Sequence, residues 1–488
     1  MGRGILFAIL VAALVGVAAL PVRAAPGDLD TSFGQDGYAT YQVNKACLQG
    51  CVEFGGSYAD ALALEPDGKI VLGGFNEYLG AFVHGGASEI PGELVRLQSN
   101  GSLDPSFGDA GVVDDTFLRV NEVIPNARGG LLAIGEGARG TGLQRYTPNG
   151  VLDGEYGSAG VRWLPQGAEG QRDTAGLFTR FVEVRVAATE YEPSTTRLDV
   201  RRLLPSGELD DRFGHGGYAA LPGSEGAMPS AVVSEPHGGV LVAFRLPVPS
   251  PYAPNAKAGK LVLERLTASG TLDRSFGTHR LARPALPADL SGVVVAIHDR
   301  HIIIAFGERD ATRDLSDRAT LALAELTHAG RLDRHFGKAG VARSVLALEG
   351  GHLLGASPHA IAYDRAGNAI VAGRLSIPTV DTPAGVAFLA RYTPAGRDCS
   401  FGTHGAVIDE SLGTANAVAL QPNGRIILAG GLGRFVAARY MGGGVPRTCR
   451  GEGALYVHSR AGRTTGIVSG QDVRPAPTGP HRRRSAPR

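Results

Sequence analysis

A short motif that recurs seven times constrains the fold of this chain more than any other feature. One regular copy, Gly101 to Gly111, reads GSLDPSFGDAG, and the pattern shared by the copies is G-x-L-D-x-x-F-G-x-x-G. The copies begin, about 61 residues apart on average, at Gly27, Gly101, Gly150, Gly207, Gly270, Gly330 and Gly396. A period of this length indicates one supersecondary unit per repeat. We therefore expect repeats over residues 27–100, 101–149, 150–206, 207–269, 270–329, 330–395 and 396–443.

The repeats contain hairpin signals between short apolar runs. In the first repeat, Glu65-Pro-Asp-Gly-Lys69 separates Ala61–Leu64 from Ile70–Gly73, and Pro-Asp-Gly favours a hairpin because Pro fixes φ and Gly accepts a positive φ. Runs such as His301–Phe306 are apolar without alternation, as in strands covered on both faces. We expect an all-β chain, a seven-bladed β-propeller of four-stranded antiparallel blades over residues 25–443. A β-solenoid is the competing architecture.

The motif itself is expected to connect the outer strand of one blade to the inner strand of the next. Its leucine and aromatic side chains would then fill the seams between blades. The leucines are Leu29, Leu103, Leu152, Leu209, Leu272 and Leu332, and the aromatic residues are Phe33, Phe107, Tyr156, Phe213, Phe276, Phe336 and Phe401.

The motif aspartates form a set of seven: Asp30, Asp104, Asp153, Asp210, Asp273, Asp333 and Asp398. A calcium site needs several oxygens that converge on one point, whereas equivalent positions of separate blades diverge, so we interpret each aspartate as an Asx-turn cap. An arginine precedes the aspartate by eight residues in four copies, as in Arg96 and Asp104. We expect ion pairs that fix the connectors, and a weaker sixth seam, where Glu325 replaces the arginine.

These motifs, followed by the hairpin type A-x-A-L-x-P-D-G-K-I-V-L-G-G and the strand type L-x-R-Y-T-P-x-G, resemble the delta-60 repeat proteins. The resemblance covers residues 27 to 443 approximately. It implies a bacterial exported protein with propeller-like repeats, and it implies no shared activity and no catalytic residues.

The two ends of the chain differ in composition from the repeats. Arg3 precedes an apolar run from Gly4 to Leu20, which predicts a signal peptide over residues 1–24, a secreted or periplasmic product and no later transmembrane segment. An uncleaved anchor is the alternative. The arginine-rich end, residues 444–488, is expected to be a disordered basic tail. The formal net charge of +1 disfavours nucleic-acid binding.

The four cysteines fit an exported protein. They allow three pairings, of which we favour Cys47 with Cys51 and Cys399 with Cys449. The second disulfide would attach the end of the chain to the last motif.

The sequence contains no nucleophile-elbow, Walker, zincin or zinc-ribbon pattern. We expect neither a cofactor nor a metal, and interpret His298 and His301 as residues that flank a turn. The favoured function is a non-enzymatic scaffold that binds a protein or glycan partner. The alternative is a metal-dependent, lactonase-like hydrolase or lyase. Such an enzyme needs acidic, Asn or His side chains on several inner strands. The inner strands are expected near Tyr38, Val112, Val161 and Tyr218, and they contain few side chains of these kinds.

Strand parity predicts where a partner would bind. In an antiparallel blade, the two kinds of connection that vary in length leave at one face, and the Pro-Asp-Gly turns and motifs leave at the other. Loops of variable length often carry function, although tolerated length drift is the alternative. The predicted binding residues on the variable loops are His84, Arg172, Asp173, Glu308, Arg309, Asp310, Asp314 and Asp381.

Overall fold

The computed structural model describes most of the repeat region. The described residues are 24–41, 57–76, 92–116, 118–126, 129–137, 139–164, 171–179, 181–189, 192–247, 259–287, 289–308, 318–348, 353–377, 385–431, 433–449 and 454–457. For residues 171–179, 183–189, 192–196 and 454–457, only the backbone is described.

Hydrogen bonding groups the strands of the described residues into seven sheets, which we number in chain order. Sheet 1 contains β2 (Ser57–Leu64), β3 (Ile70–Asn76), β4 (Gly92–Leu97) and β5 (Val112–Thr116). Sheet 2 contains β6 (Arg119–Pro125), β7 (Leu131–Gly137), β8 (Gly140–Tyr146) and β9 (Val161–Trp163). Sheet 3 contains β10 (Gln171–Thr179), β11 (Val182–Thr189), β12 (Glu192–Arg202) and β13 (Tyr218–Ala220).

The remaining sheets continue the same order. Sheet 4 contains β14 (Met228–Ser234), β15 (Val240–Pro247), β16 (Gly259–Leu266) and β17 (Leu281–Ala282). Sheet 5 contains β18 (Leu290–His298), β19 (His301–Glu308), β20 (Arg318–Thr327), β21 (Val341–Leu348) and β30 (Ala454–Val457). Sheet 6 contains β22 (Gly355–Tyr363), β23 (Ala369–Ser376), β24 (Gly385–Thr393), β25 (Gly396–Arg397) and β26 (Ala406–Asp409). Sheet 7 contains β27 (Ala415–Leu420), β28 (Ile426–Gly430), β29 (Phe435–Tyr440) and β1 (Tyr38–Tyr41).

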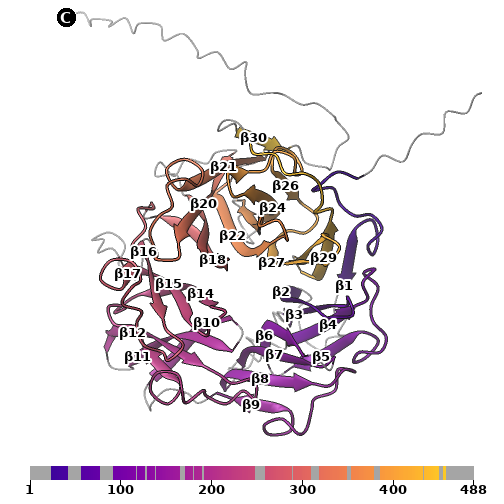
Figure 1. The fold of residues 1–488 in the computed structure, drawn as a ribbon. Helices are drawn as coiled ribbons and strands as arrows, with labels where there is room; N and C mark the ends of the chain where they lie inside the picture. The colour runs from indigo at the N-terminus through magenta and orange to yellow at the C-terminus, as the bar shows by residue number, and fades with distance from the viewer. Residues whose placement is uncertain are drawn as a thin grey trace, which may run out of the picture.

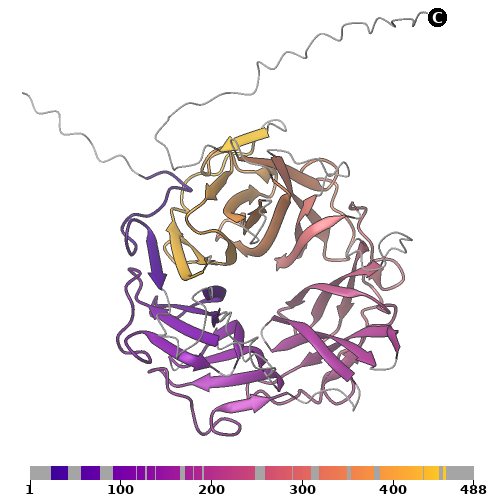
Figure 2. The same ribbon diagram turned by 180° about the vertical axis from the view of Figure 1, so that it is seen from behind.

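The sheets stand around a common centre (Figures 1 and 2). The first strands β2, β6, β10, β14, β18, β22 and β27 lie nearest the centre, and each contacts the first strand of the next sheet. The contact between β27 and β2 closes the circle. Every pair of neighbouring strands is antiparallel except β21 with β30, and the fifth strands of sheets 5 and 6 are additions to a four-stranded pattern. The prediction of a β-propeller with four-stranded antiparallel blades is confirmed.

The sheets are offset from the sequence repeats by one strand. The motif from Gly101 to Gly111 lies between β4 and β5, which pair with each other in sheet 1. The motif therefore connects the third and fourth strands of one sheet, and the prediction that it links neighbouring blades is wrong. The short strand after each motif pairs with the strand before the motif, so both belong to the same sheet. The sequence does not show this pairing. As a result, β1 completes sheet 7 by pairing with β29.

The motif aromatic residues fill the seams between sheets, as predicted. All seven are at most 4% exposed. Phe276, for example, packs between Leu263 of sheet 4 and Ile304 of sheet 5. The leucine of the same motif, Leu272, packs at the preceding seam, between sheets 3 and 4. A connector with both residues can thus pack against both faces of its sheet, although Leu103 is 38% exposed and the last copy has Arg397 in place of the leucine.

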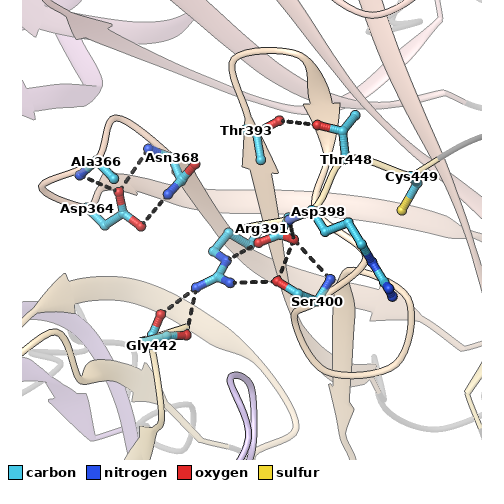
Figure 3. Close-up of polar contacts among 12 residues, drawn as sticks. Asp364, Ala366, Asn368, Arg391, Thr393, Asp398, Ser400, Gly442, Thr448 and Cys449 are labelled. Carbon is cyan, nitrogen blue, oxygen red and sulfur yellow. Dashed lines mark hydrogen bonds and ion pairs between the residues drawn. The ribbon is translucent and has the colours of Figure 1, made fainter. Parts of the chain in front are cut away.

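Each motif aspartate accepts a hydrogen bond from the backbone N–H two residues further on, which is Asx-turn geometry. Five also pair with the arginine of the preceding strand, as expected. The N–O distances are 2.8 Å for Arg96–Asp104, 2.8 Å for Arg145–Asp153, 2.7 Å for Arg202–Asp210, 3.7 Å for Arg265–Asp273 and 2.6 Å for Arg391–Asp398. Figure 3 shows the last pair, in which Arg391 also reaches Ser400 and the carbonyl of Gly442, just after β29 of sheet 7.

A sixth pair closes the ring and follows from the offset of the sheets. Arg439 on β29 lies 2.8 Å from Asp30, which belongs to the first motif copy. Its Nη1 donates to the carbonyl of Ser99 in sheet 1, at 2.7 Å. We call the six residues Arg96, Arg145, Arg202, Arg265, Arg391 and Arg439 the seam arginines.

The C-terminal segment is partly ordered on the ring. Cys399 and Cys449 form the predicted disulfide, with Cα atoms 5.0 Å apart, whereas Cys47 and Cys51 lie outside the described residues. β30 pairs in parallel with β21. The prediction of disorder from residue 444 onward is therefore wrong for 454–457, because the edge of β21 offers free backbone groups. In the described part of the chain, no helix is long and apolar enough to cross a membrane, and residues 1–23 lie outside it.

We predict that the burial of a seam arginine determines its contribution to stability. Arg391 and Asp398 are 1% and 0% exposed, so Arg391→Ala leaves a buried carboxylate unpaired and should cost about 3–5 kcal/mol. Arg145 and Asp153 are 33% and 27% exposed, so Arg145→Ala should cost about 1 kcal/mol or less. Urea unfolding under non-reducing conditions measures both values. Equal losses in the two variants would contradict the prediction.

We also predict loss of stability in acid. Burial opposes ionisation of Asp30, but hydrogen bonds from Ser32 and the guanidinium groups of Arg425 and Arg439 outweigh it and lower the pKa to about 2, from 3.8. Ionised Asp30 therefore stabilises the fold above about pH 4, and this contribution is lost as the pH falls through about 2. The unfolding free energy should decline across this window and decline less in Asp30→Asn. An equal decline in that variant would contradict the assignment.

Candidate functional site

The first strand of every sheet carries a β-bulge at a corresponding position. In sheet 1 the pairing of β2 with β3 passes from Ala59 to Ala61 and leaves Asp60 unpaired in the ladder. The residues at the seven bulges are Asp60, Asn121, Ala175 with Gly176, Ser230, Gly292, His359 and Asn416. A bulge redirects a side chain and is common next to functional sites. In the four adjacent sheets 6, 7, 1 and 2, the bulge residue is polar: His359, Asn416, Asp60 and Asn121.

Four polar side chains from four adjacent first strands form one hydrogen-bonded chain, which we call the axial cluster. Arg119 Nη2 on β6 donates to Asp60 Oδ2 on β2 at 3.0 Å. Asn416 Nδ2 on β27 donates to Asp60 Oδ1 at 3.0 Å. His359 Nδ1 on β22 lies 3.1 Å from Asn416 Oδ1. The axial cluster thus joins residues up to 356 positions apart around the centre of the ring.

The hydrogen bonds determine the orientation of the groups. Asn416 Nδ2 also donates to the carbonyl of Ala59 at 3.1 Å, so its Oδ1 must accept, and His359 Nδ1 carries the proton. Burial and the charge of Arg374 lower the pKa of His359, while its hydrogen bond to Asn416 opposes the shift. Burial raises the pKa of Asp60, against the opposing effect of Arg119.

An aromatic pair supports Arg119 beside the axial cluster. The guanidinium carbon of Arg119 lies 3.9 Å from the ring centroid of Phe75, and Phe75 stacks on Tyr58 at 5.2 Å. A guanidinium over an aromatic face is held electrostatically. Arg119 is 42% exposed, so the cluster presents a positioned cation to solvent.

Both oxygens of Asp60 already accept hydrogen bonds, one of them from a guanidinium. A divalent cation at Asp60 would have to displace Arg119, because like charges so close together are unfavourable. The axial cluster is therefore better suited to hydrogen-bonding a polar ligand than to holding a metal.

The axial cluster lies toward one face of the ring. β2 begins just after the variable connection 42–56 and ends at the Pro-Asp-Gly turn, and the antiparallel order repeats this in every sheet. We call the two sides the loop face and the connector face. Arg119 is the first residue of its strand, Asn416 the second and Asp60 the fourth. The predicted separation of variable loops from motifs follows from this topology.

Three of the eight predicted binding residues lie among the described residues. His84, Arg309, Asp310, Asp314 and Asp381 lie outside the described residues. Arg172 and Asp173 lie on β10, where the backbone alone is described. Glu308 ends β19 at the loop face and pairs with Arg343, with Nη2 and Oε1 2.8 Å apart.

The sequence does not reveal the axial cluster, because the inner strands were expected after the motifs, whereas those strands are the fourth in their sheets. A signal did exist in the sequence. Each of Asp60, His359 and Asn416 is a polar residue just before an apolar stretch of the hairpin, as in D-A-L-A-L. Their proximity, however, depends on the order of the sheets.

A second polar group lies on the connector face, at the seam of sheets 5 and 6. His301, Glu325 and Asp333 have ligand-type atoms within 4.8 Å of one another, and His301 Nδ1 lies 2.6 Å from Glu325 Oε1. Burial raises the pKa of Glu325, and the charge of Asp333 adds to this. His301 and Glu325 line a cavity of about 390 Å³. His298 and His301 are direct partners across the β18–β19 hairpin, as the turn interpretation predicted.

Comparisons with known proteins agree with the architecture. A family model described as "Domain of unknown function (DUF5122) beta-propeller" matches residues 65–107. The chain is thus a β-propeller built from sequence repeats. No curated protein matches the propeller significantly.

Solved structures that resemble the propeller do so only distantly. A protein of unknown function from Dyadobacter fermentans has 10% identity and a TM-score of 0.37, covering 83% of this chain and 99% of its own. Drosophila Plexin A in complex with Semaphorin 1b has 10% identity and a TM-score of 0.34, with coverage of 78% and 84%. Trypanosoma rangeli sialidase in complex with sialic acid has 10% identity and a TM-score of 0.37, with coverage of 86% and 59%. Scores this low carry no argument about function.

We predict that His359 titrates below its usual value of 6.5, because its buried ring favours the neutral form. NMR titration of the imidazole measures this directly. Because the folded pKa is the lower one, the contribution to stability is present above pH 6.5 and is lost as the pH falls below that value. Asn416→Leu removes the acceptor of the Nδ1 proton and should change the titration. An unshifted pKa in the wild type would contradict the assigned network.

Proposed function

We propose that this chain is an exported, non-enzymatic β-propeller that binds a protein or glycan partner at its loop face, over the axial cluster. The observation that supports this most is the convergence of Arg119, Asp60, Asn416 and His359 from four adjacent first strands. Long variable connections leave the sheets at the same face. A fixed polar centre on the face from which variable connections leave is a common arrangement for ligand recognition.

The chemistry of the cluster favours binding over catalysis. It contains no nucleophile next to a general base, since His359 donates its Nδ1 proton to an amide oxygen. Arg119 and Asp60 instead provide a donor and an acceptor at fixed positions, which suits hydroxyl groups of a sugar or polar groups of a peptide.

The hydrolase or lyase alternative has one observation in its favour. Asp60, Asn416 and His359 are side chains of the kinds that such enzymes place on inner strands. Arg119, bonded to Asp60 at 3.0 Å, argues against a metal there. Calorimetric titration of the purified chain with Ca²⁺ and Zn²⁺ separates the two functions, because a tight complex that is lost in Asp60→Asn would support the enzyme.

Export and the number of blades are part of the same proposal. The Cys399–Cys449 disulfide is consistent with an oxidising compartment, and so are the N-terminal sequence pattern and the resemblance to delta-60 repeat proteins. We infer further that all seven sheets serve as blades of one ring, an inference supported by the contacts between successive first strands.

We predict that binding depends on Arg119 and Asp60 more than on the connector face. The mature chain would be screened on a glycan array and against extracellular proteins, and hits measured by surface plasmon resonance. Asp60→Asn and Arg119→Gln should each weaken binding about tenfold or more, the loss expected for one charge-assisted hydrogen bond.

Arg425→Gln, on the connector face, provides the control and should bind like the wild type. Loss of binding in Arg425→Gln with retention in Arg119→Gln would place the site on the connector face and refute the proposal. Thermal melting of each variant confirms folding.

A further inference from the structure

Six seams of the ring hold an arginine guanidinium in the same environment. Each seam arginine lies beside a motif carboxylate and over the motif aromatic ring. The distances from the guanidinium carbon to the ring centroid are 4.4 Å in Arg96–Phe107, 4.7 Å in Arg145–Tyr156, 4.6 Å in Arg202–Phe213, 4.5 Å in Arg265–Phe276, 4.8 Å in Arg391–Phe401 and 4.7 Å in Arg439–Phe33. The molecule thus contains six internal examples of one guanidinium-binding environment.

At four of the six seams, those of Arg96, Arg202, Arg391 and Arg439, a turn of the next sheet supplies a third element, a backbone carbonyl. Arg96 Nη1 donates to the carbonyl of Pro148, just after β8, at 2.7 Å. Arg202 Nη1 donates to the carbonyl of Gly238, in the turn between β14 and β15, at 2.9 Å. A carboxylate, an aromatic face and a backbone carbonyl are together the groups that bind a guanidinium well.

At the seam of sheets 5 and 6, the arginine is replaced while its surroundings remain. Glu325 occupies the seam-arginine position on β20, and its backbone bonds to Asp333 as those of the seam arginines bond to theirs. The cavity there is lined by Glu325, Phe336, Gly367 and Pro394. Pro394 ends an R-Y-T-P sequence identical to that of Pro148, and Gly367 ends a hairpin turn as Gly238 does. The groups that receive a guanidinium elsewhere therefore line this cavity.

At this seam two carboxylates, Glu325 and Asp333, stand where the other six have an arginine beside an aspartate. Glu325 and Asp333 are 12% and 21% exposed. Of the basic residues that the structure describes, His301 contacts Glu325 and His335 contacts Asp333. The hydroxyl oxygen of Tyr363, which also lines the cavity, is buried and has no hydrogen-bond partner among the described residues. Arg365 lies exposed at the rim.

We propose that this cavity binds the guanidinium group of a ligand, in the place that a seam arginine fills at the other six seams. The guanidinium lies over Phe336 and pairs with the carboxylates of Glu325 and Asp333. It donates to the backbone of the sheet 6 turns and to the Tyr363 hydroxyl. The site lies on the connector face and is separate from the axial cluster, so it is a second binding site.

A metal ion fits this cluster less well than an organic cation. Glu325 already bonds to His301, and Asp333 Oδ1 accepts from the backbone and ring nitrogens of His335, each at 3.0 Å. With a volume of about 390 Å³ and an aromatic wall, the cavity is larger and less polar than a metal site requires. Each of the six internal examples holds a guanidinium.

Binding of agmatine to the purified mature chain tests the proposal, with N-butylurea as the uncharged control probe. We expect agmatine to bind by NMR or calorimetric titration, with a Kd of about 1 mM or below, and N-butylurea not to bind. Glu325→Gln should weaken agmatine binding about tenfold, since it removes one carboxylate charge. Glu325→Arg restores the repeat pattern, so its own side chain should fill the cavity, abolish agmatine binding and raise the melting temperature.

Glu208→Gln is the matched control, because Glu208 is a carboxylate on the same face at another seam, and it should leave binding unchanged. The peptide acetyl-Gly-Arg-Gly-amide distinguishes an arginine side chain of a partner from a free small molecule, and binding of either supports the proposal. Absence of agmatine binding at about 10 mM, unchanged binding in folded Glu325→Arg, or binding of ZnCl₂ in place of agmatine with loss in His301→Ala would each overturn it.

Discussion

The ring depends on the ion pair between a seam arginine and a motif aspartate. Each sheet is too small to cover its own apolar faces, so it is stable only when both faces pack on neighbours. The aromatic residue of the motif fills one seam, and the guanidinium above it reaches the carbonyl groups of the next sheet. One side chain therefore organises the connector, the aromatic residue and the neighbouring sheet at once.

The same interaction explains which features the sequence could predict. The pairing of Arg96 with Asp104 was predictable because both residues recur at a fixed spacing on either side of a turn. The burial of Phe107 was predictable because an aromatic residue in a recurring connector must be covered by something. Both predictions rest on contacts between residues close in sequence or repeated along it.

Other features depend on the order of strands in space, which local patterns do not encode. The strands Tyr38–Tyr41 and Ser57–Leu64 both resemble ordinary strands, and nothing in either sequence indicates which lies at the centre. Tyr38–Tyr41 was expected to be an inner strand, whereas the structure places Ser57–Leu64 at the centre. The axial cluster was hidden for the same reason, because Asp60 and Asn416 meet only after the ring has closed.

The offset between repeats and sheets has a consequence for how the chain reaches its folded state. β1 lies near the N-terminus, but its hydrogen-bonding partner β29 is about 400 residues later in the chain. During synthesis, sheet 7 cannot be completed until β29 has emerged. Until then β1 has no partner strand, so we expect the last step of folding to be the capture of this first strand by the last repeat.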